Sequence, residues 1–276
     1  MEALRIGPLV IGMERVAALA AVAVFLLAVW VVARRLAPEA AARLDGWAWR
    51  SVVLGAIAGR LVHVAQNWDS FAPEPWRALA FWQGGFSAQG ALVTVGALTL
   101  LELWRRDRAP LGRPMALSLA LGMGTWVGVQ LLQGPLYAPG PPAQVFTAID
   151  GRAISLAERE GRPAVVNLWA TWCPPCRREL PMMAEVAGQH PEVDVIFANQ
   201  REAPQTVGLF LATEGLRLGI VVLDEAGALG RHYAVLGLPT TLFLDAGGRV
   251  VERHVGEISR EAFSAGLARL SAPPPD

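Results

Sequence analysis

The chain has 276 residues, which is long enough for two structural units. Hydrophobic residues make up 53% of it and charged residues only 17%, while the formal net charge is zero. This balance gives no basis for nucleic-acid binding, which depends on clustered positive charge. The apolar excess lies in the first half of the chain.

Four apolar stretches in that half predict membrane-spanning helices. Three of them contain no charged residue and are long enough to cross a hydrocarbon layer of roughly 30 Å: residues 16–33, 81–101 and 114–138. The remaining stretch, residues 51–67, is interrupted by Arg60 and His63. Because Arg34 and Arg35 follow the first stretch where a cleavage site would show small residues, we expect a retained helix and not a removed signal peptide.

Arginine placement predicts how these helices are oriented. The chain contains no lysine, and the loop between the second and third stretches holds only Arg77. The first and third loops hold eight arginines: Arg34, Arg35, Arg43, Arg50, Arg105, Arg106, Arg108 and Arg113. By the positive-inside rule, these two loops are cytoplasmic. We therefore expect a multi-pass protein of the bacterial inner (plasma) membrane, with a periplasmic C-terminal half.

Three strings in the first half carry a family resemblance: Arg5-Ile6-Gly7-Pro8-Leu9, Gly59-Arg60-Leu61 and the run from Trp82 to Gly90, WQGGFSAQG. They resemble the opening third of prolipoprotein diacylglyceryl transferase, over about residues 4–135. That membrane enzyme moves a diacylglyceryl group from phosphatidylglycerol to a lipoprotein cysteine. The resemblance implies a transmembrane domain that contacts membrane lipid.

The chemistry of that family does not carry over to this chain. The position of the family's functional histidine is Gln89, and the arginine of its later signature is missing near Gly124-Thr125. Glutamine cannot act as a general base near pH 7, and threonine cannot neutralise a phosphate. We expect a degenerate copy that serves as an anchor, or as a lipid or partner contact.

Arg60 has two interpretations. A charge within a span usually faces a cavity or a partner, so Arg60, with His63 one turn along, could contact an anionic lipid headgroup. Alternatively, Arg60 snorkels or donates hydrogen bonds to carbonyl oxygens inside the bundle. The sequence leaves both interpretations open.

The proline-rich residues 137–142 predict a short, stiff linker between a transmembrane domain, residues 1–136, and a second domain, residues 143–276. Strands and helices alternate in the second domain, which predicts an α/β fold. The expected strands are 164–169, 193–198, 220–223, 240–244 and 250–255, and the expected helices are 174–186, 204–214, 226–233 and 259–270. The predicted fold class is an α-helical membrane bundle of about four helices followed by an α/β domain.

The only two cysteines, Cys173 and Cys176, lie between a predicted strand and a predicted helix. A helix N-terminus stabilises the thiolate of the first cysteine and lowers its pKa, and the second cysteine is close enough to resolve a mixed disulfide. Zinc would need further ligands, but the four histidines show no ligand spacing, so we expect no metal. A purely structural disulfide is disfavoured because the loop is so short. The pattern predicts thiol–disulfide chemistry.

Residues 166–179, VNLWATWCPPCRRE, and residues 237–245, GLPTTLFLD, resemble the TlpA/ResA/DsbE branch of the thioredoxin superfamily. The resemblance covers about residues 143–271. It implies a thioredoxin-like fold, a redox-active Cys173–Cys176 disulfide with no further cofactor, and a cis Pro239 beside the cysteines that leaves a backbone edge for substrate.

Other residues near the motif have roles that rest on this resemblance. Glu179 matches a glutamate that the family uses near its cysteines, where it could exchange a proton with Cys176; the alternative is a solvated carboxylate on a helix face. Asn167 replaces the buried aspartate of plain thioredoxins. Trp169 is expected in the core. The candidate substrate-binding residues are Trp172, Pro174, Pro175 and Leu238.

We therefore expect a membrane-anchored periplasmic thiol–disulfide oxidoreductase. A reductase is favoured because the Pro-Pro pair lacks the histidine of strong oxidants. Residues 1–172 contain no cysteine, so electrons must come from another protein, a membrane thiol transporter. The resemblance implies protein disulfide substrates such as apocytochrome c, and hence a role in cytochrome c maturation. The alternatives are a diacylglyceryl transferase or a lipid-binding membrane scaffold that carries a redox domain.

Overall fold

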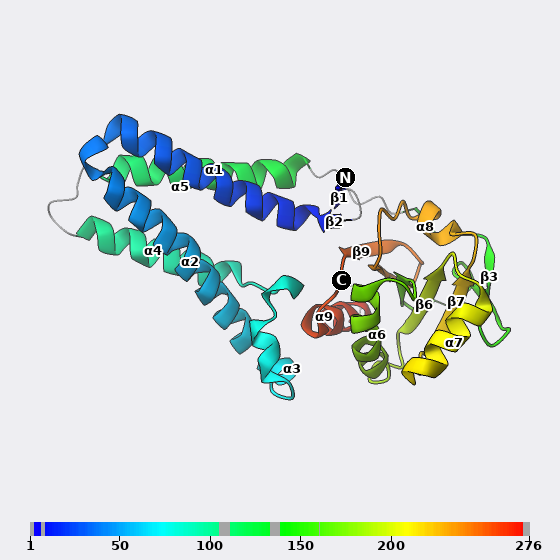
Figure 1. Cartoon of the computed structure of the whole chain (residues 1–276). Helices are drawn as coiled ribbons and strands as arrows, with labels where there is room; N and C mark the ends of the chain where they lie inside the picture. Colours follow the sequence, from blue (N-terminus) through cyan, green and yellow to red (C-terminus); the bar gives the residue numbers. More distant parts are fainter. Residues whose placement is uncertain (1–2, 7–8, 105–110, 133–138, 160, 273–276) are drawn as a thin grey trace. The chain divides into compact units, whose positions relative to one another are not determined.

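The computed structural model describes residues 3–6, 9–104, 111–132, 139–159 and 161–272 (Figure 1). It divides into two compact units. One comprises Met13–Gly134, and the other comprises Met1–Gly12 together with Pro135–Asp276. The predicted linker lies partly outside the described residues, at 137 and 138, and the predicted domain boundaries stay predictions.

The first unit is helical. Its long helices are α1 (Met13–Leu36), α2 (Ala41–Gln66), α4 (Ala88–Trp104) and α5 (Gly112–Leu132), joined by the short helix α3 (Trp68–Phe71) and by 3-10 turns at Pro38–Ala40, Pro75–Leu79 and Phe81–Gln83. Helix α1 packs against α5 and α2, and α2 packs against α4. The rings of Phe25 and Trp47 meet edge to face at 5.5 Å between centroids. Around them, Leu44 and Met115 are buried and close the core between α1, α2 and α5.

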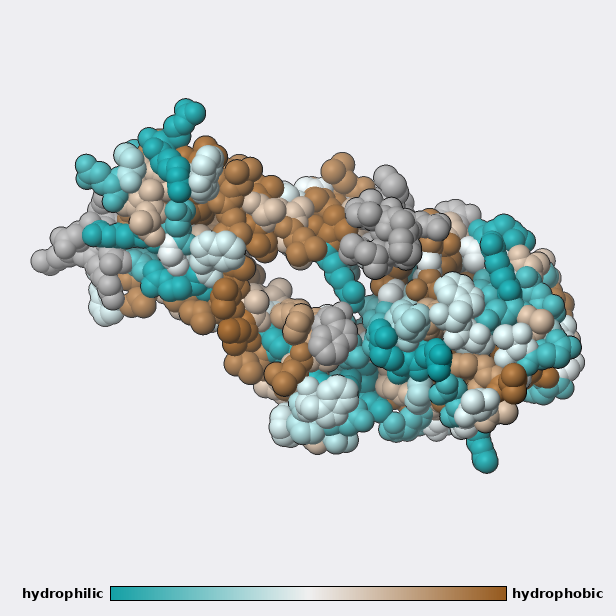
Figure 2. Space-filling model, viewed as in Figure 1, coloured by the Kyte–Doolittle hydropathy of each residue, from teal (hydrophilic) through white to brown (hydrophobic). Residues whose placement is uncertain are grey.

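The length and composition of α1 and α5 allow each of them to cross a membrane. Helix α4 is apolar but spans only 17 residues, and α2 carries Arg43, Asp45, Arg50 and Arg60. Figure 2 shows a broad apolar band over the helical unit, with hydrophilic residues gathered at the end where α1 meets α2. The unit is thus a helical region with two candidate spans, and a bundle of about four transmembrane helices stays a prediction.

The third apolar stretch begins its helix later than the sequence predicts. Residues 81–83 form a 3-10 turn, and α4 starts only at Ala88. Gly84 and Gly85 have φ angles of 85° and 78°, a left-handed conformation that interrupts a helix and that glycine adopts without steric cost. An apolar run therefore predicted the presence of a helix, while its start depended on these two glycines.

The second unit contains an antiparallel hairpin, β1 (Ala3–Ile6) with β2 (Leu9–Gly12), and a seven-stranded sheet in the order β4-β3-β7-β6-β5-β8-β9. The strands of this sheet are β3 (Val145–Ala148), β4 (Ala153–Ser155), β5 (Ala164–Trp169), β6 (Asp194–Gln200), β7 (Ile220–Asp224), β8 (Thr240–Leu244) and β9 (Val250–Val255). Strands β5, β6 and β7 are parallel, while β8 runs antiparallel to β5 and β9 antiparallel to β8. Strand β5 lies inside the sheet between β6 and β8, and it is buried along its whole length.

Helices cover both faces of this sheet, which gives the thioredoxin-like α/β fold. The helices are α6 (Pro174–Ala187), α7 (Pro204–Glu214), α8 (Ala228–His232) and α9 (Arg260–Ser271). Apolar residues of α6, α7 and α9 pack in one core, and those of α8 pack in the core on the other face. All nine elements predicted for this domain are present, with ends that differ by two residues or fewer. Strands β3 and β4 were not predicted, because runs of four and three residues give too short a pattern.

Candidate active site

The cysteine motif starts helix α6 at the carboxyl end of β5. Cys173 is the N-cap of α6, with an extended backbone (φ −91°, ψ 105°), and its Sγ accepts a hydrogen bond from the backbone N–H of Cys176 at 3.3 Å. Pro174 and Pro175 occupy the first helical positions, where a backbone N–H would have no acceptor within the helix, so its absence in proline costs nothing. The sulfur of Cys173 thus takes the place that a serine or aspartate oxygen takes at an ordinary helix start.

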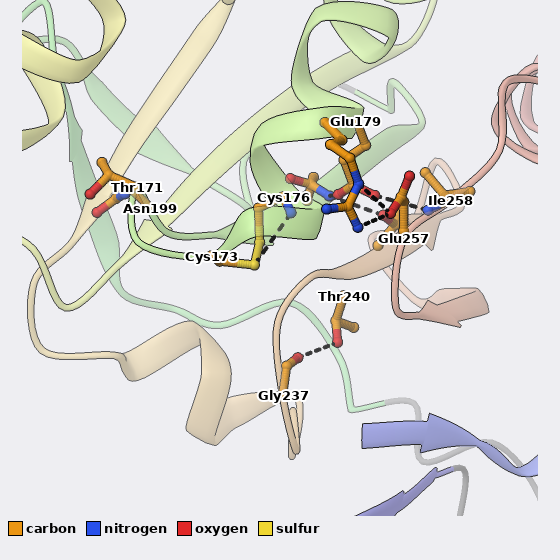
Figure 3. Close-up of a disulfide and its surroundings, with 12 residues drawn as sticks. Thr171, Cys173, Cys176, Glu179, Asn199, Gly237, Thr240, Glu257 and Ile258 are labelled. Atoms are coloured by element: carbon orange, nitrogen blue, oxygen red, sulfur yellow. Dashed lines mark hydrogen bonds and ion pairs between the residues drawn. A yellow bond between two sulfur atoms is a disulfide. The ribbon is translucent and has the colours of Figure 1, made fainter. Parts of the chain in front are cut away.

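Cys173 and Cys176 are joined by a disulfide, with 5.3 Å between their Cα atoms. Figure 3 shows this disulfide at the first turn of α6, with Glu179 further along the same helix. Both cysteines are buried in this oxidised state, Cys173 being 3% exposed and Cys176 fully covered. Cys173 is therefore the more exposed of the two residues.

Glu179 lies in the domain interior, where it is 2% exposed. Its Oε1 accepts a hydrogen bond from Asn167 Nδ2 at 2.9 Å, and its Oε2 accepts one from the backbone N–H of Ile258, also at 2.9 Å. The pKa of Glu179 is raised to about 8: burial is the largest cause and the charge of Glu257 adds to it, while the two hydrogen bonds and Arg178 oppose the rise. The alternative of a solvated carboxylate is wrong, because α6 turns this position toward the sheet.

Pro239 precedes β8, which pairs with β5 and so brings the proline to the end of the strand that leads into the cysteines. The Leu238–Pro239 peptide bond is cis. Pro239 is buried, and its carbonyl accepts a hydrogen bond from the N–H of Gly256 at 2.9 Å. Leu238 is half-buried and packs against both cores. Thr240 donates a hydrogen bond to the carbonyl of Gly237 at 2.7 Å, which fixes the turn before the proline.

Apolar surface surrounds the disulfide. Trp172 is 68% exposed, Pro174 is exposed and Pro175 is half-buried. Trp169, by contrast, is fully buried and packs against Phe210 of α7 at 5.7 Å between ring centroids. The two tryptophans therefore divide as the sequence predicts, one in the core and one at the rim of the site.

Sequence reasoning missed a polar network next to the motif. Both carboxylate oxygens of Glu202 bind Thr171: one accepts from its backbone N–H at 2.7 Å and the other from its hydroxyl at 2.5 Å. Asn199 Nδ2 also donates to Glu202 at 2.7 Å. The network holds the loop that leads to Cys173. One signal could have found it, because Glu202 follows β6, and the carboxyl ends of parallel strands meet at one edge of a sheet.

Arg60 of the helical unit is bound to backbone carbonyls. Its guanidinium donates to the carbonyl oxygens of Arg77, Ala78, Gly84 and Gly85 at distances of 2.7 to 2.9 Å. These bonds support the interpretation that Arg60 donates hydrogen bonds to carbonyl oxygens inside the bundle. A contact between Arg60 and a lipid headgroup stays a prediction. Among the residues that the structure describes, no group of three histidine, cysteine, aspartate or glutamate side chains could hold a metal ion.

Both halves of the chain match protein-family models. The model described as Redoxin matches residues 138–268, and the model described as prolipoprotein diacylglyceryl transferase matches residues 2–128. The chain is 34% identical over 119 residues to the thiol-disulfide oxidoreductase ResA of Halalkalibacterium halodurans. This match covers 42% of this chain and 67% of that protein. It is 31% identical over 132 residues to ResA of Bacillus thuringiensis, covering 47% and 76% respectively.

Among solved structures, StoA from Bacillus subtilis is 26% identical, with a TM-score of 0.42 over 48% of this chain and 98% of that one. The sheet order, the disulfide at the start of α6 and the cis proline before β8 define a thioredoxin-like thiol–disulfide oxidoreductase domain. Through this C-terminal half the chain belongs to the ResA family of thiol–disulfide oxidoreductases. Its N-terminal half is similar to prolipoprotein diacylglyceryl transferase, as the sequence motifs predict.

Proposed function

We propose that this protein reduces disulfides in other proteins by means of the Cys173–Cys176 dithiol. The thiolate of Cys173 attacks a substrate disulfide, forms a mixed disulfide and releases one substrate thiolate, which takes up a proton. Cys176, once deprotonated, attacks Cys173, releases the second substrate thiol and closes the disulfide. Two electrons pass to the substrate, and the cysteine pair is itself the redox group, so the reaction needs no cofactor.

The position of the Cys173 sulfur carries this proposal. It lies at the N-terminus of α6, where the helix dipole and the N–H of Cys176 favour a thiolate. Glu179, buried in the same helix, is proposed to accept the proton of Cys176 and to return it when the disulfide is reduced again. A carboxyl group whose pKa is near 8 can exchange a proton with a thiol close to neutral pH.

The substrate is proposed to lie against the apolar rim formed by Trp172, Pro174, Pro175 and Leu238. There its backbone can pair with the chain next to Pro239. The sequence resemblance supports apocytochrome c cysteines as substrates, and the Pro-Pro pair supports the reducing direction.

The helical half is proposed to anchor the protein in the bacterial inner membrane through about four helices, with the redox domain in the periplasm. The two candidate spans and the arginine asymmetry support this placement. Since residues 1–172 contain no cysteine, a separate membrane thiol transporter is proposed as the electron donor.

Insulin reduction by the pre-reduced full chain tests the proposed activity. The wild type is expected to reduce insulin, and Cys173→Ser to be inactive. Cys176→Ser is the matched variant: it should retain the attacking thiol and accumulate a mixed disulfide with the substrate. Equal trapping by the two variants would contradict the assigned roles. A peptide with the haem-binding pattern Cys-x-x-Cys-His, in its disulfide form, tests apocytochrome c as substrate and should be reduced faster than insulin.

A further inference from the structure

Asn167 lies beneath α6 on the central strand β5, fully buried. Its Nδ2 donates two hydrogen bonds, to Glu179 Oε1 at 2.9 Å and to Thr241 Oγ1 at 3.1 Å. Its Oδ1 is buried and has no hydrogen-bond partner among the described residues. An unpartnered buried acceptor is costly and calls for an explanation, above all beside a redox site.

The contacts of Glu179 determine where it can hold a proton. Its Oε2 faces the backbone N–H of Ile258, which can only donate. Oε2 therefore accepts in both protonation states, a role that suits the carbonyl oxygen of a neutral carboxyl group, and this places a proton taken up by Glu179 on Oε1. That oxygen faces Asn167. With Nδ2 in this place, the hydroxyl hydrogen of a protonated Oε1 would either meet a donor or have to turn away from Asn167.

A half-turn of the Asn167 carboxamide removes this conflict. The two ends of a carboxamide have nearly the same shape, so the turn leaves the packing of the core unchanged. Oδ1 would then accept from the protonated Oε1 of Glu179 and also from the hydroxyl of Thr241, which can both donate and accept. Nδ2 would take the place that is now occupied by the unpartnered Oδ1, so the same end of the carboxamide lacks a partner among the described residues in both states. The hydrogen bonds of Asn167 with Glu179 and with Thr241 are both kept, with donor and acceptor exchanged.

We propose that Asn167 is a positioning residue whose carboxamide turns over whenever Glu179 gains or loses a proton, so that Glu179 keeps two hydrogen bonds in both states. The proposal rests on the proposed proton exchange between Glu179 and Cys176. It gives a reason for asparagine at this position: an aspartate would add a second titrating group, and a leucine would support neither state of Glu179.

Other charges near Glu179 come from two elements. Arg178 neighbours it on α6, and Glu257 lies in the segment before α9; the two form an ion pair, with 3.0 Å between Arg178 Nε and Glu257 Oε2. Cys176 lies one turn earlier on α6. The charges of Glu257 and Arg178 act on Glu179 in opposite directions. Neither provides the reversible hydrogen bond that Asn167 can give.

Nuclear magnetic resonance of the full chain in detergent micelles tests the proposal, because the protein has only three asparagines, Asn67, Asn167 and Asn199. With 15N-labelled asparagine, the side-chain NH2 signals can be followed from pH 6 to pH 10. The Asn167 signal is expected to shift with a midpoint near pH 8, following Glu179. Its cross-peaks to the Thr241 side chain should be present above the midpoint and absent below it. Asn199 provides the internal control for an intact fold.

Glu179→Gln provides the matched variant. The introduced glutamine side chain must still accept from Ile258, so its NH2 group faces Asn167 and should hold the carboxamide in the low-pH orientation throughout the range. A wild-type Asn167 signal that does not change with pH would overturn the proposal, as would a pH transition that persists in the variant. The acid–base role of Glu179 is judged separately: it fails if the rate at which Cys176 resolves a mixed disulfide has the same pH profile in wild type and variant.

Discussion

Replacing Glu179 by glutamine should change how the stability of the redox domain depends on pH. An unfolded glutamate releases its proton near pH 4.5, whereas burial raises the pKa of folded Glu179 to about 8. Between these values the folded state binds the extra proton, so the free energy of unfolding falls as pH rises. The loss is about 1.36 kcal/mol per pH unit, and so about 4 kcal/mol between pH 5 and pH 8.

Glutamine has no proton to lose, and it can make the hydrogen bonds of a neutral glutamic acid. We therefore expect Glu179→Gln to match the wild type near pH 5 and to exceed its stability by about 4 kcal/mol at pH 8. Pulse proteolysis in urea, applied to the oxidised full chain in detergent, measures the unfolding of this domain. Parallel pH dependences for the two proteins would refute the reasoning. They would mean that the pKa of Glu179 is the same in the folded and unfolded states.

Four further outcomes are expected. In the reduced protein, Cys173 should be alkylated faster than Cys176, since it is the more exposed residue and caps a helix N-terminus; mass spectrometry decides, and the reverse order would exchange their roles. Alkaline phosphatase fused to the C-terminus should be active in cells, whereas fluorescence of a cytoplasmic reporter alone would contradict the predicted orientation. In sealed proteoliposomes with reductant only on the cytoplasmic side, the disulfide should stay oxidised until a membrane thiol transporter is added; reduction without it would refute the predicted need for a donor. Gly266→Ala should lower the free energy of unfolding by about 1–3 kcal/mol, because its Cβ would lie 2.1 Å from the Phe243 ring, while Gly208→Ala, where the nearest atom is 4.0 Å away, should not destabilise.

Local patterns sufficed to predict much of the redox domain. A continuous apolar run predicted the buried strand β5, two cysteines with prolines between them predicted the start of α6, and the turn at residues 245–248 predicted the β8–β9 hairpin. Each of these features depends on neighbours in the chain, through strand burial, helix capping and turn geometry. The short strands β3 and β4 could not be found this way, because the sheet edge that they extend is formed by β7, more than seventy residues away.

The amino-acid sequence by itself determined the chemistry: a single cysteine pair at a strand-to-helix junction, an apolar half without cysteine, and an asparagine where plain thioredoxins have an aspartate. Only the tertiary structure decided the environment of Glu179, because its buried state depends on β5, β8 and the segment before α9 meeting beneath α6. The same holds for Glu202, which follows β6 and reaches Thr171 after the neighbouring strand β5. Hydrogen-bond partners that are distant in the chain are set by strand order and register, and a local pattern contains neither.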